Sequence, residues 1–298
     1  MIKYIGILSF LLFISTNVSS QSSVTKVIYP DALGENDRRQ RYFIDLLNLA
    51  LEHSKKEYGP YKLIISDTPL PSVRVPQMIL TTELISVMSS PETDTLNNKL
   101  LKVPIPLLMG VQGLRLSLIH EDNKNLFKNT NELASLEPLI FGQGIGWVDT
   151  KILVDNGLKV QTAAIYDSLF GMVSQKRVHA FPRGLNEIYQ ELEAWGEQYP
   201  NLYVDPHIAL YYPLPVNFYV NPADPALKDR LVLGLNNAKD SGDFDQLFNQ
   251  HFADILEKAN IEKRRIFILK NQYNPSQFAP QFRRHLLPAL QNVLGDAN

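Results

Sequence analysis

One stretch in the second half of the chain reads Arg177-Val-His-Ala-Phe-Pro-Arg-Gly-Leu-Asn-Glu187. Its apolar start predicts a short buried strand over Val178–Phe181, which Pro182 should end. The periodic residues that follow predict a helix from Leu185 onward. Ligands of open α/β sheets bind outside the carboxyl ends of strands, beside such helix starts. The stretch therefore predicts a binding position in an α/β fold, with Arg183 as its cation.

Along the remaining chain, predicted strands alternate with predicted helices. Strands are expected at 24–29, 61–65, 84–88, 138–141, 159–161, 202–204 and 265–269. Helices are expected at 38–54, 75–82, 147–156, 167–175, 185–195, 226–239, 244–252 and 282–294. This alternation favours parallel βαβ units over an all-β domain.

Two long extended segments, Leu114–His120 and Tyr211–Val220, interrupt the alternation. We interpret the first as the connector that leaves one lobe and the second as the connector that returns to it. The expected fold is α/β, with two Rossmann-like lobes joined by two hinge segments. Residues 21–115 and 216–298 would form the first lobe, and residues 116–215 the second.

Residues 1–20 have the pattern of a secretory signal peptide. Lys3 gives a positive start, an apolar run follows from Tyr4 to Ile14, and Val18-Ser-Ser20 supplies small residues for cleavage. A retained N-terminal anchor is the less favoured alternative. The chain has no cysteine, so we expect no lipid on the mature N-terminus. We expect a soluble protein exported to the periplasm.

Composition argues against several classes of function. The 29 basic residues nearly balance 31 acidic ones, which is not the surface of a nucleic-acid-coating protein. The lack of cysteine excludes a thiolate metal site, and no two histidines have His-x-x-x-His spacing. No Gly-x-Ser-x-Gly motif occurs. We therefore expect no metal, no cofactor and no enzymatic activity, and we interpret His179 as a buried, hydrogen-bonded histidine.

A glycine-rich loop, Gly142-Gln-Gly-Ile-Gly146, lies between a predicted strand and a predicted helix. It matches neither a dinucleotide fingerprint nor a Walker loop, because the third glycine comes too early and no Gly-Lys-Ser/Thr follows. One interpretation is a tight strand-to-helix turn. The other is a ligand-facing loop whose amides meet an anion, with Trp147 as a flat apolar surface.

Arg183 has two interpretations of equal weight. On the surface, it would pair with Glu187 four residues later and contribute little to stability. In a cleft, it would hold a carboxylate or phosphate through two parallel hydrogen bonds. Its position after a buried strand makes the cleft a serious alternative. Glu191 and Glu193, on the following helix, are expected to be solvated.

Further candidate ligand-binding residues end strands of the first lobe, where they could face the same cleft. They are Tyr29, Ser89, Ser90 and Glu92. On the second lobe, Glu187 and Asp167 complete the candidate set.

The chain resembles the type II periplasmic solute-binding proteins, in particular the family 3 branch associated with polar amino-acid uptake. The resemblance rests on these passages: Ile85–Glu92 with Leu101–Leu107, Ile140–Trp147, Asp167–Phe181, Pro213–Pro222 and Ala238–Phe248. It implies two α/β lobes that close on a ligand about two hinge segments.

The sequence departs from this family where ligands are held. Amino-acid binders of the family carry an arginine in the loop after the first-lobe strand, where this chain has Ser90-Pro-Glu-Thr-Asp94. They carry an aspartate after the second-lobe strand, where this chain has Pro182-Arg-Gly184. The charge pattern is nearly inverted, so the chain is most similar to members without a characterised ligand.

We expect an exported, monomeric solute-binding protein that closes on a small polar, carboxylate-bearing ligand and serves an ABC permease or a membrane sensor. Arg183 would anchor the anion, Trp147 would stack, and Ser89, Ser90 and Glu92 would add hydrogen bonds. An enzyme on the same scaffold is the alternative, with Glu92 opposite His179 or Asp167. A third possibility is a degenerate lobe pair that binds another protein.

Overall fold

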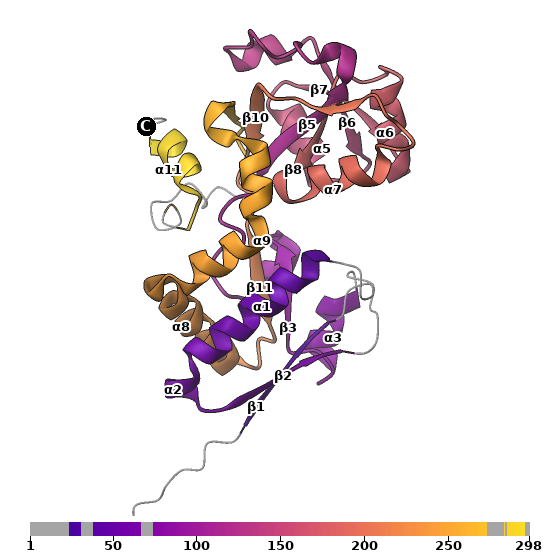
Figure 1. The fold of residues 1–298 in the computed structure, drawn as a ribbon. Coiled ribbons are helices and arrows are strands. Elements are labelled where there is room, and N and C mark those ends of the chain that lie inside the picture. Colours follow the sequence, from indigo (N-terminus) through magenta and orange to yellow (C-terminus); the bar gives the residue numbers. More distant parts are fainter. Residues whose placement is uncertain (1–23, 31–37, 67–73, 273–282, 284, 296–298) are drawn as a thin grey trace, which may run out of the picture.

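The computed structural model describes residues 24–30, 38–66, 74–272, 283 and 285–295. The predicted signal peptide, residues 1–20, lies outside this part of the chain and stays a prediction. The described chain forms two lobes, one above the other in Figure 1, with strands and helix α9 running between them. Each lobe contains two β-sheets covered by helices. None of the helices in these ranges is long and apolar enough to cross a membrane.

The first lobe, at the bottom of Figure 1, is built on strands from both ends of the chain. They are β1 (Thr25–Tyr29), β2 (Tyr61–Ile65), β3 (Val87–Pro91), β4 (Leu101–Lys102) and β11 (Val216–Val220). β1 and β2 pair in parallel, and β11 lies antiparallel between β3 and β4. The Ser86 amide donates to the Ile28 carbonyl at 2.8 Å, which joins β1 to the start of β3.

The helices of this lobe are α1 (Arg38–His53), α2 (Lys55–Tyr58), α3 (Val75–Thr81), α4 (Asp94–Lys99) and α8 (Pro225–Ser241). α1 and α8 pack against each other at Gly234. A Cβ atom at this position would lie 1.8 Å from the Ala50 carbonyl oxygen. Only glycine allows the two helix backbones to approach so closely.

Gly234→Ala should lower the stability of the folded chain by about 1–3 kcal/mol, because α1 and α8 must move apart to admit the methyl group. The midpoint of urea unfolding measures this loss. Gly295→Ala is the control, because a Cβ atom at that helix end meets nothing within 4 Å. Equal midpoints for the two variants would contradict the close packing of α1 on α8.

The second lobe contains a larger mixed sheet and a parallel pair. Its strands are β5 (Leu114–His120), β6 (Ile140–Gly144), β7 (Lys159–Ala163), β8 (Phe181–Gly184), β9 (Leu202–Val204), β10 (Ile208–Tyr211) and β12 (Arg265–Ile268). β12, β10, β5 and β8 follow one another in the sheet, and β9 also pairs with β5. A bridge between Phe141 and Ala180 connects the parallel pair β6–β7 to the chain entering β8.

In the described ranges, three α-helices cover this lobe, and two more lie where the lobes meet. The first three are α5 (Val148–Asp155), α6 (Tyr166–Ser174) and α7 (Leu185–Trp195). α9 (Asp243–Ala259) packs on α1 and α8 of the first lobe and on α7 of the second. α11 (Pro288–Gly295) lies beside the region where the lobes meet (Figure 1).

The predicted α/β elements are largely confirmed, with α7 and β9 at the predicted bounds. Three predictions were wrong. The strand predicted at Val178–Phe181 lies instead at Phe181–Gly184, so Pro182 does not end it but pairs with Ser117 inside β8. Leu114–His120 is a core strand of the second lobe rather than a connector. β12 pairs with β10, so this part of 216–298 belongs to the second-lobe sheet.

The chain crosses between the lobes at residues 108–113, the first crossing, and at residues 212–215, the second crossing. On the first-lobe side, the Leu107 amide donates to the Val216 carbonyl at 2.9 Å. On the second-lobe side, the Tyr212 amide donates to the Gly113 carbonyl at 3.2 Å. A Cβ atom on Gly113 would lie 2.0 Å from the Tyr212 carbonyl oxygen. The crossings therefore touch, as expected for a two-segment hinge. α9 provides a further passage, which leads the chain to β12.

The C-terminal segment is docked on the first crossing. The Leu287 amide donates to the Met109 carbonyl at 2.9 Å. Met109 and Gly110 both have left-handed backbones, with φ of 48° and 88°. Leu286 and Leu290 cover Gly110, where a Cβ atom would lie 3.0 and 2.8 Å from their methyl groups. The crossing is thus bent sharply beneath α11.

Candidate functional site

Arg183 is buried in the wall of the second lobe that α7 and the loop before α5 form. It is 8% exposed, and its Nε donates to Glu191 Oε2 at 2.7 Å. Its Nη2 donates to the other oxygen of Glu191 and lies 3.2 Å from Glu187. Glu191 was predicted to be solvated, and this was wrong. One turn beyond Glu187, it lies on the face of α7 that meets β8.

Aromatic rings surround the same guanidinium group. Its central carbon lies 5.0 Å from the ring centre of Trp147, 5.1 Å from Phe181 and 5.6 Å from Tyr166. The Tyr166 hydroxyl donates to Glu191 at 2.6 Å. These contacts hold Arg183 in place, so it is neither a surface arginine nor a free bidentate anchor for an anion.

Arg183 and its two carboxylate partners, Glu187 and Glu191, together carry a net negative charge. Burial lowers the pKa of Arg183, but the hydrogen bond to Glu191 and the charge of Glu187 outweigh it and raise the pKa above the usual value. The Nε–Nη2 edge, which would bind a ligand carboxylate bidentately, is taken by Glu191. Among the described residues, no acceptor is found for Nη1. Arg183 can therefore offer a ligand only the two N–H groups of Nη1, not its Nε–Nη2 fork.

Trp147 lies at the edge of this wall, immediately before α5. Its ring rests on Gly144, where a Cβ atom would come within 2.3 Å of the indole. The ring stays partly exposed, next in sequence to Val148 at 37% and near Ile145 at 62% exposure. Ile165, 67% exposed, follows the neighbouring strand β7. The polar group of Arg183 thus lies behind an apolar edge.

The glycine loop is a tight turn. The amides of Ile145 and Trp147 donate to the carbonyls of Ala163 and Gly144, at 3.0 and 3.2 Å. Gly146 has a φ of 79°, which glycine adopts without strain. With two of its amides engaged inside the chain, this loop favours the turn interpretation over an anion cradle.

The first-lobe candidates are partly brought together. The hydroxyls of Tyr29 and Ser89 share a hydrogen bond of 2.6 Å, and burial raises the pKa of Tyr29. The Ser90 hydroxyl donates to the Pro91 carbonyl at 3.1 Å. Both serines are half-buried at the end of β3. This end of β3 pairs with Val216 and Asn217, which directly follow the second crossing.

Glu92 lies elsewhere, beside the hinge. It pairs with Lys102 and accepts a hydrogen bond from Asn97 at 2.8 Å. It lines a hollow of about 530 Å³, a volume that includes space open to solvent. The other lining residues are Lys102, Pro104, Pro106, Leu108, Gly110, Gln112, Tyr211, Pro213, Leu214, Pro215, Val216, Asn217 and Leu286. The hollow thus belongs to the crossings and to the C-terminal segment rather than to the Arg183 wall.

The remaining candidates have simple placements. Asp167 is exposed in the first turn of α6, and no polar partner is described for it. His179 accepts a hydrogen bond from the Ile140 amide at 3.0 Å, as predicted, although it is only half-buried. In the described ranges, no three histidine or acidic side chains lie close enough together to hold a metal ion.

Sequence reasoning missed Arg115, Asp149 and Tyr212, which continue the Arg183 network inward. Arg115 lies in the apolar strand Leu114–His120, and a charged residue within an apolar run is a signal that the sequence does contain. A charged side chain in a strand buried on both faces needs acidic partners. The partners themselves, Asp149 and Glu187, come from distant helices and have no local signature.

No protein-family model matches the sequence, and no curated protein matches it significantly. Solved structures do match. The probable amino-acid ABC transporter extracellular-binding protein YtmK from Bacillus subtilis has 11% identity and a TM-score of 0.56, over 78% of this chain and 99% of that chain. Substrate-binding domain 2 of GlnP from Lactococcus lactis, in an open conformation, has 15% identity and a TM-score of 0.53, over 78% and 96%. The chain therefore has the two-lobe fold of type II periplasmic binding proteins, as predicted.

Proposed function

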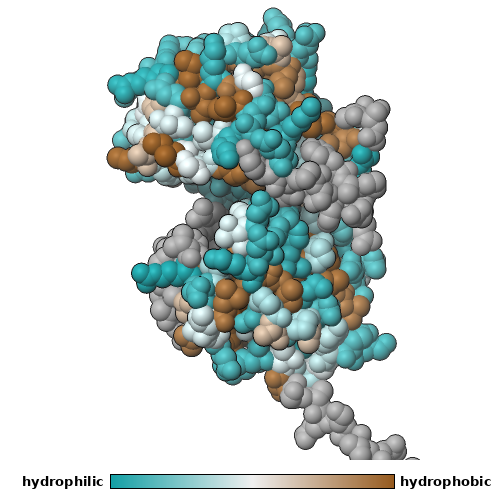
Figure 2. Space-filling model, turned by 180° about the vertical axis from the view of Figure 1, so that it is seen from behind, coloured by the Kyte–Doolittle hydropathy of each residue, from teal (hydrophilic) through white to brown (hydrophobic). Residues whose placement is uncertain are grey.

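We propose that the chain is a solute-binding protein, exported through its N-terminal segment, whose two lobes close over a small polar ligand. The observation that carries this proposal is the pair of α/β lobes linked at touching crossings, with candidate polar groups on each facing edge. Figure 2 shows the groove between the lobes on one side of the molecule. A similar fold occurs in a probable extracellular-binding protein of an amino-acid ABC transporter, YtmK. An ABC permease or a membrane sensor would recognise the closed form.

The geometry of the second-lobe wall supports a neutral or cationic ligand. Glu191 already occupies the bidentate edge of Arg183, and Glu187 adds a second carboxylate. An anion would meet net negative charge there. The N–H groups of Arg183 Nη1 can donate to a carbonyl or hydroxyl oxygen, and the edge around Trp147 can contact an apolar part of the ligand. A carboxylate on the ligand would have to bind another group.

Closure would supply most of the affinity. Ser89 and Ser90 on the first lobe and the Trp147 edge on the second contact the ligand together only when the lobes approach. A ligand that binds both lobes shifts the population toward the closed form by its differential affinity. The lobes therefore need no strong single anchor.

A thermal-shift screen with neutral, cationic and anionic amino acids, dipeptides and dicarboxylates tests this proposal. We expect a neutral or cationic compound to raise the melting temperature. Trp147→Ala should weaken its calorimetric affinity by at least about tenfold, or 1.4 kcal/mol. Tyr203→Ala is the control, because Tyr203 is an exposed aromatic residue on β9. Stabilisation by dicarboxylates alone would contradict the charge argument, and stabilisation by no compound would contradict solute binding.

The enzyme alternative loses its proposed pair. Glu92 bonds to Lys102 and Asn97 in the first lobe, while His179 accepts from a backbone amide in the second. Asp167 is exposed on α6. Because Glu92 and His179 already have partners of their own, and no described contact joins either of them to Asp167, we propose binding rather than catalysis.

A further inference from the structure

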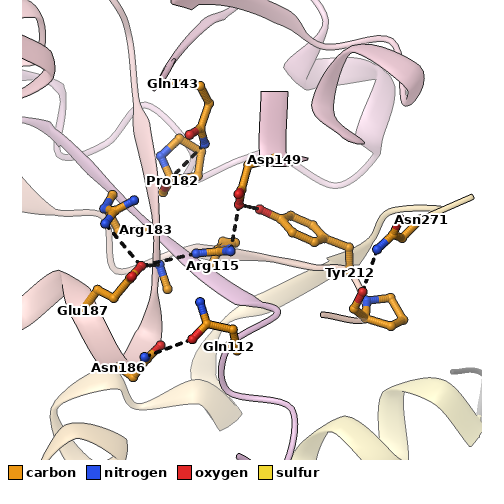
Figure 3. Close-up of polar contacts among 12 residues, drawn as sticks. Gln112, Arg115, Gln143, Asp149, Pro182, Arg183, Asn186, Glu187, Tyr212 and Asn271 are labelled. Atoms are coloured by element: carbon orange, nitrogen blue, oxygen red, sulfur yellow. Dashed lines mark hydrogen bonds and ion pairs between the residues drawn. The ribbon is translucent and has the colours of Figure 1, made fainter. Parts of the chain in front are cut away.

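A row of buried charges leads from the cleft wall toward the hinge (Figure 3). Arg115 on β5 is 2% exposed. Its Nη2 lies 2.7 Å from Asp149 Oδ1, and its Nη1 donates to Glu187 Oε2 at 3.4 Å. The same Glu187 oxygen contacts Arg183 and accepts the Gly184 amide at 3.1 Å. Arg115 thus joins the first turn of α5 to the first turn of α7.

The other end of the row holds the second crossing. The Tyr212 hydroxyl donates to Asp149, and the Arg115 guanidinium lies 5.3 Å from the centre of the Tyr212 ring. The next residue is also fixed, because the Pro213 carbonyl accepts a hydrogen bond from Asn271 at 2.7 Å. Tyr212 is therefore tied to α5 at the point where the chain leaves the second lobe.

The first crossing is held by the start of α7, the helix that also carries Glu187. The Asn186 side chain, in the first turn of α7, donates to Gln112 Oε1 at 3.1 Å. Asn186 is next to Glu187 in sequence, and Trp147 is two residues before Asp149. The starts of α5 and α7, which follow Trp147 and strand β8 with Arg183, thus also fix the second-lobe ends of both crossings.

We propose that Arg115 is a positioning residue that couples the ligand-facing wall to the hinge. It keeps Asp149 and Glu187 in place, and through them Tyr212 and the start of α7. A ligand that orders the Trp147 edge also orders α5, which holds the second crossing. Rotation of the lobes then occurs about residues beyond Tyr212 and before Gly113. The effect of a ligand in this inference rests on the proposed binding function. The effect of the network on the hinge does not.

The energetics of buried ions support a role beyond folding. Replacing a buried ion pair by well-packed apolar groups is often neutral or stabilising. Arg115 has two acidic partners, but its Nε has no acceptor among the described residues. An aliphatic side chain would pack equally well at this position, because the strand is otherwise buried and largely apolar. A network that ties two helix starts to two crossings provides a reason for the charge.

Tyr212→Phe tests the coupling, with Tyr211→Phe as a matched control. Both tyrosines are buried and adjacent, but Tyr211 lines the hinge hollow and Tyr212 bonds to Asp149. Because the chain has no cysteine, Lys56→Cys and Glu197→Cys place one exposed spin label on each lobe. Double electron–electron resonance then gives the interlobe distance distribution. We expect Tyr212→Phe to broaden it in the absence of ligand and Tyr211→Phe to leave it unchanged.

Asp149→Asn is the second variant, which keeps an acceptor for Tyr212 but removes the charge opposite Arg115. It should broaden the distribution as well, and it decides the test if Tyr212→Phe does not fold. With a bound ligand, both variants should lose affinity by roughly 5- to 150-fold, the range of couplings between sites. A merely structural role would lower the melting temperature and leave the distribution of the folded protein unchanged. That result would overturn the proposal.

The two proposals fail separately. If no compound binds, the proposed function is wrong, while the ligand-free distributions still decide whether the network holds the hinge. If a compound binds and the folded variants keep the wild-type distribution and affinity, the coupling is wrong and the binding function stands.

Discussion

Arg183→Ala is expected to lower the stability of the folded chain by about 3–5 kcal/mol, the cost of removing one partner from a buried ion pair. The substitution would leave Glu191 and Glu187, both largely buried, without their nearest positive charge. It would also remove the cation beside the Trp147 ring. Chemical denaturation followed by tryptophan fluorescence measures the loss.

Two further variants show whether pairing causes this loss. Glu193→Gln, on an exposed position of α7, should leave stability unchanged. Arg183→Leu combined with Glu191→Leu should recover much of the stability that Arg183→Ala loses, because no unpaired charge then remains at Glu191. If Arg183→Ala unfolds at the wild-type denaturant concentration, Arg183 is unpaired in solution and again becomes a candidate anion anchor.

Leu290→Ala should cost about 2–5 kcal/mol, the usual range for a fully buried leucine. Leu290 is completely buried on Gly110, and α11 reaches the hinge through this contact and through the Leu287 backbone. Loss of the side chain would leave a cavity over the sharply bent first crossing. Thermal unfolding monitored by circular dichroism provides the measurement.

Asn292→Ala is the matched control on α11, because Asn292 is exposed. The two variants should differ clearly in melting temperature. If Leu290→Ala melts with the wild type, α11 is not docked on the first crossing in solution, and the strand pairs alone hold the hinge.

Much of the fold could be predicted from local patterns. The helix Leu185–Trp195 has a clear apolar face and starts directly after a glycine. These two signals predicted its bounds, and the structure confirms them. The strand Leu202–Val204 lies between turn residues and was also confirmed. The alternation of strands and helices then predicted two α/β lobes, because few other architectures bury such elements.

The errors arose where distant partners override local signals. Pro182 was expected to end a strand, but β8 ends the path from β12 through β10 and β5, and an edge strand can accommodate proline. β12 follows a long helix that packs largely on the first lobe, yet pairs with β10 of the second. No pattern near Arg265–Ile268 encodes that pairing.

The candidate site was predicted in part. Arg183 and Trp147 do lie together, as the second-lobe loops suggested. Glu191 could not be recognised, because its helix pattern is typical of an exposed face and its partner comes from the preceding strand. Whether the predicted first-lobe residues Ser89 and Ser90 contact a ligand stays a prediction.

The central claim is that the lobes close on a small ligand, and the interlobe distance tests it most directly. The Lys56→Cys and Glu197→Cys pair would carry the labels, and the compound that raises the melting temperature most would be added to saturation. We predict that the broad ligand-free distribution contracts to a single shorter distance. An unchanged distribution in the presence of a saturating, stabilising compound would contradict closure.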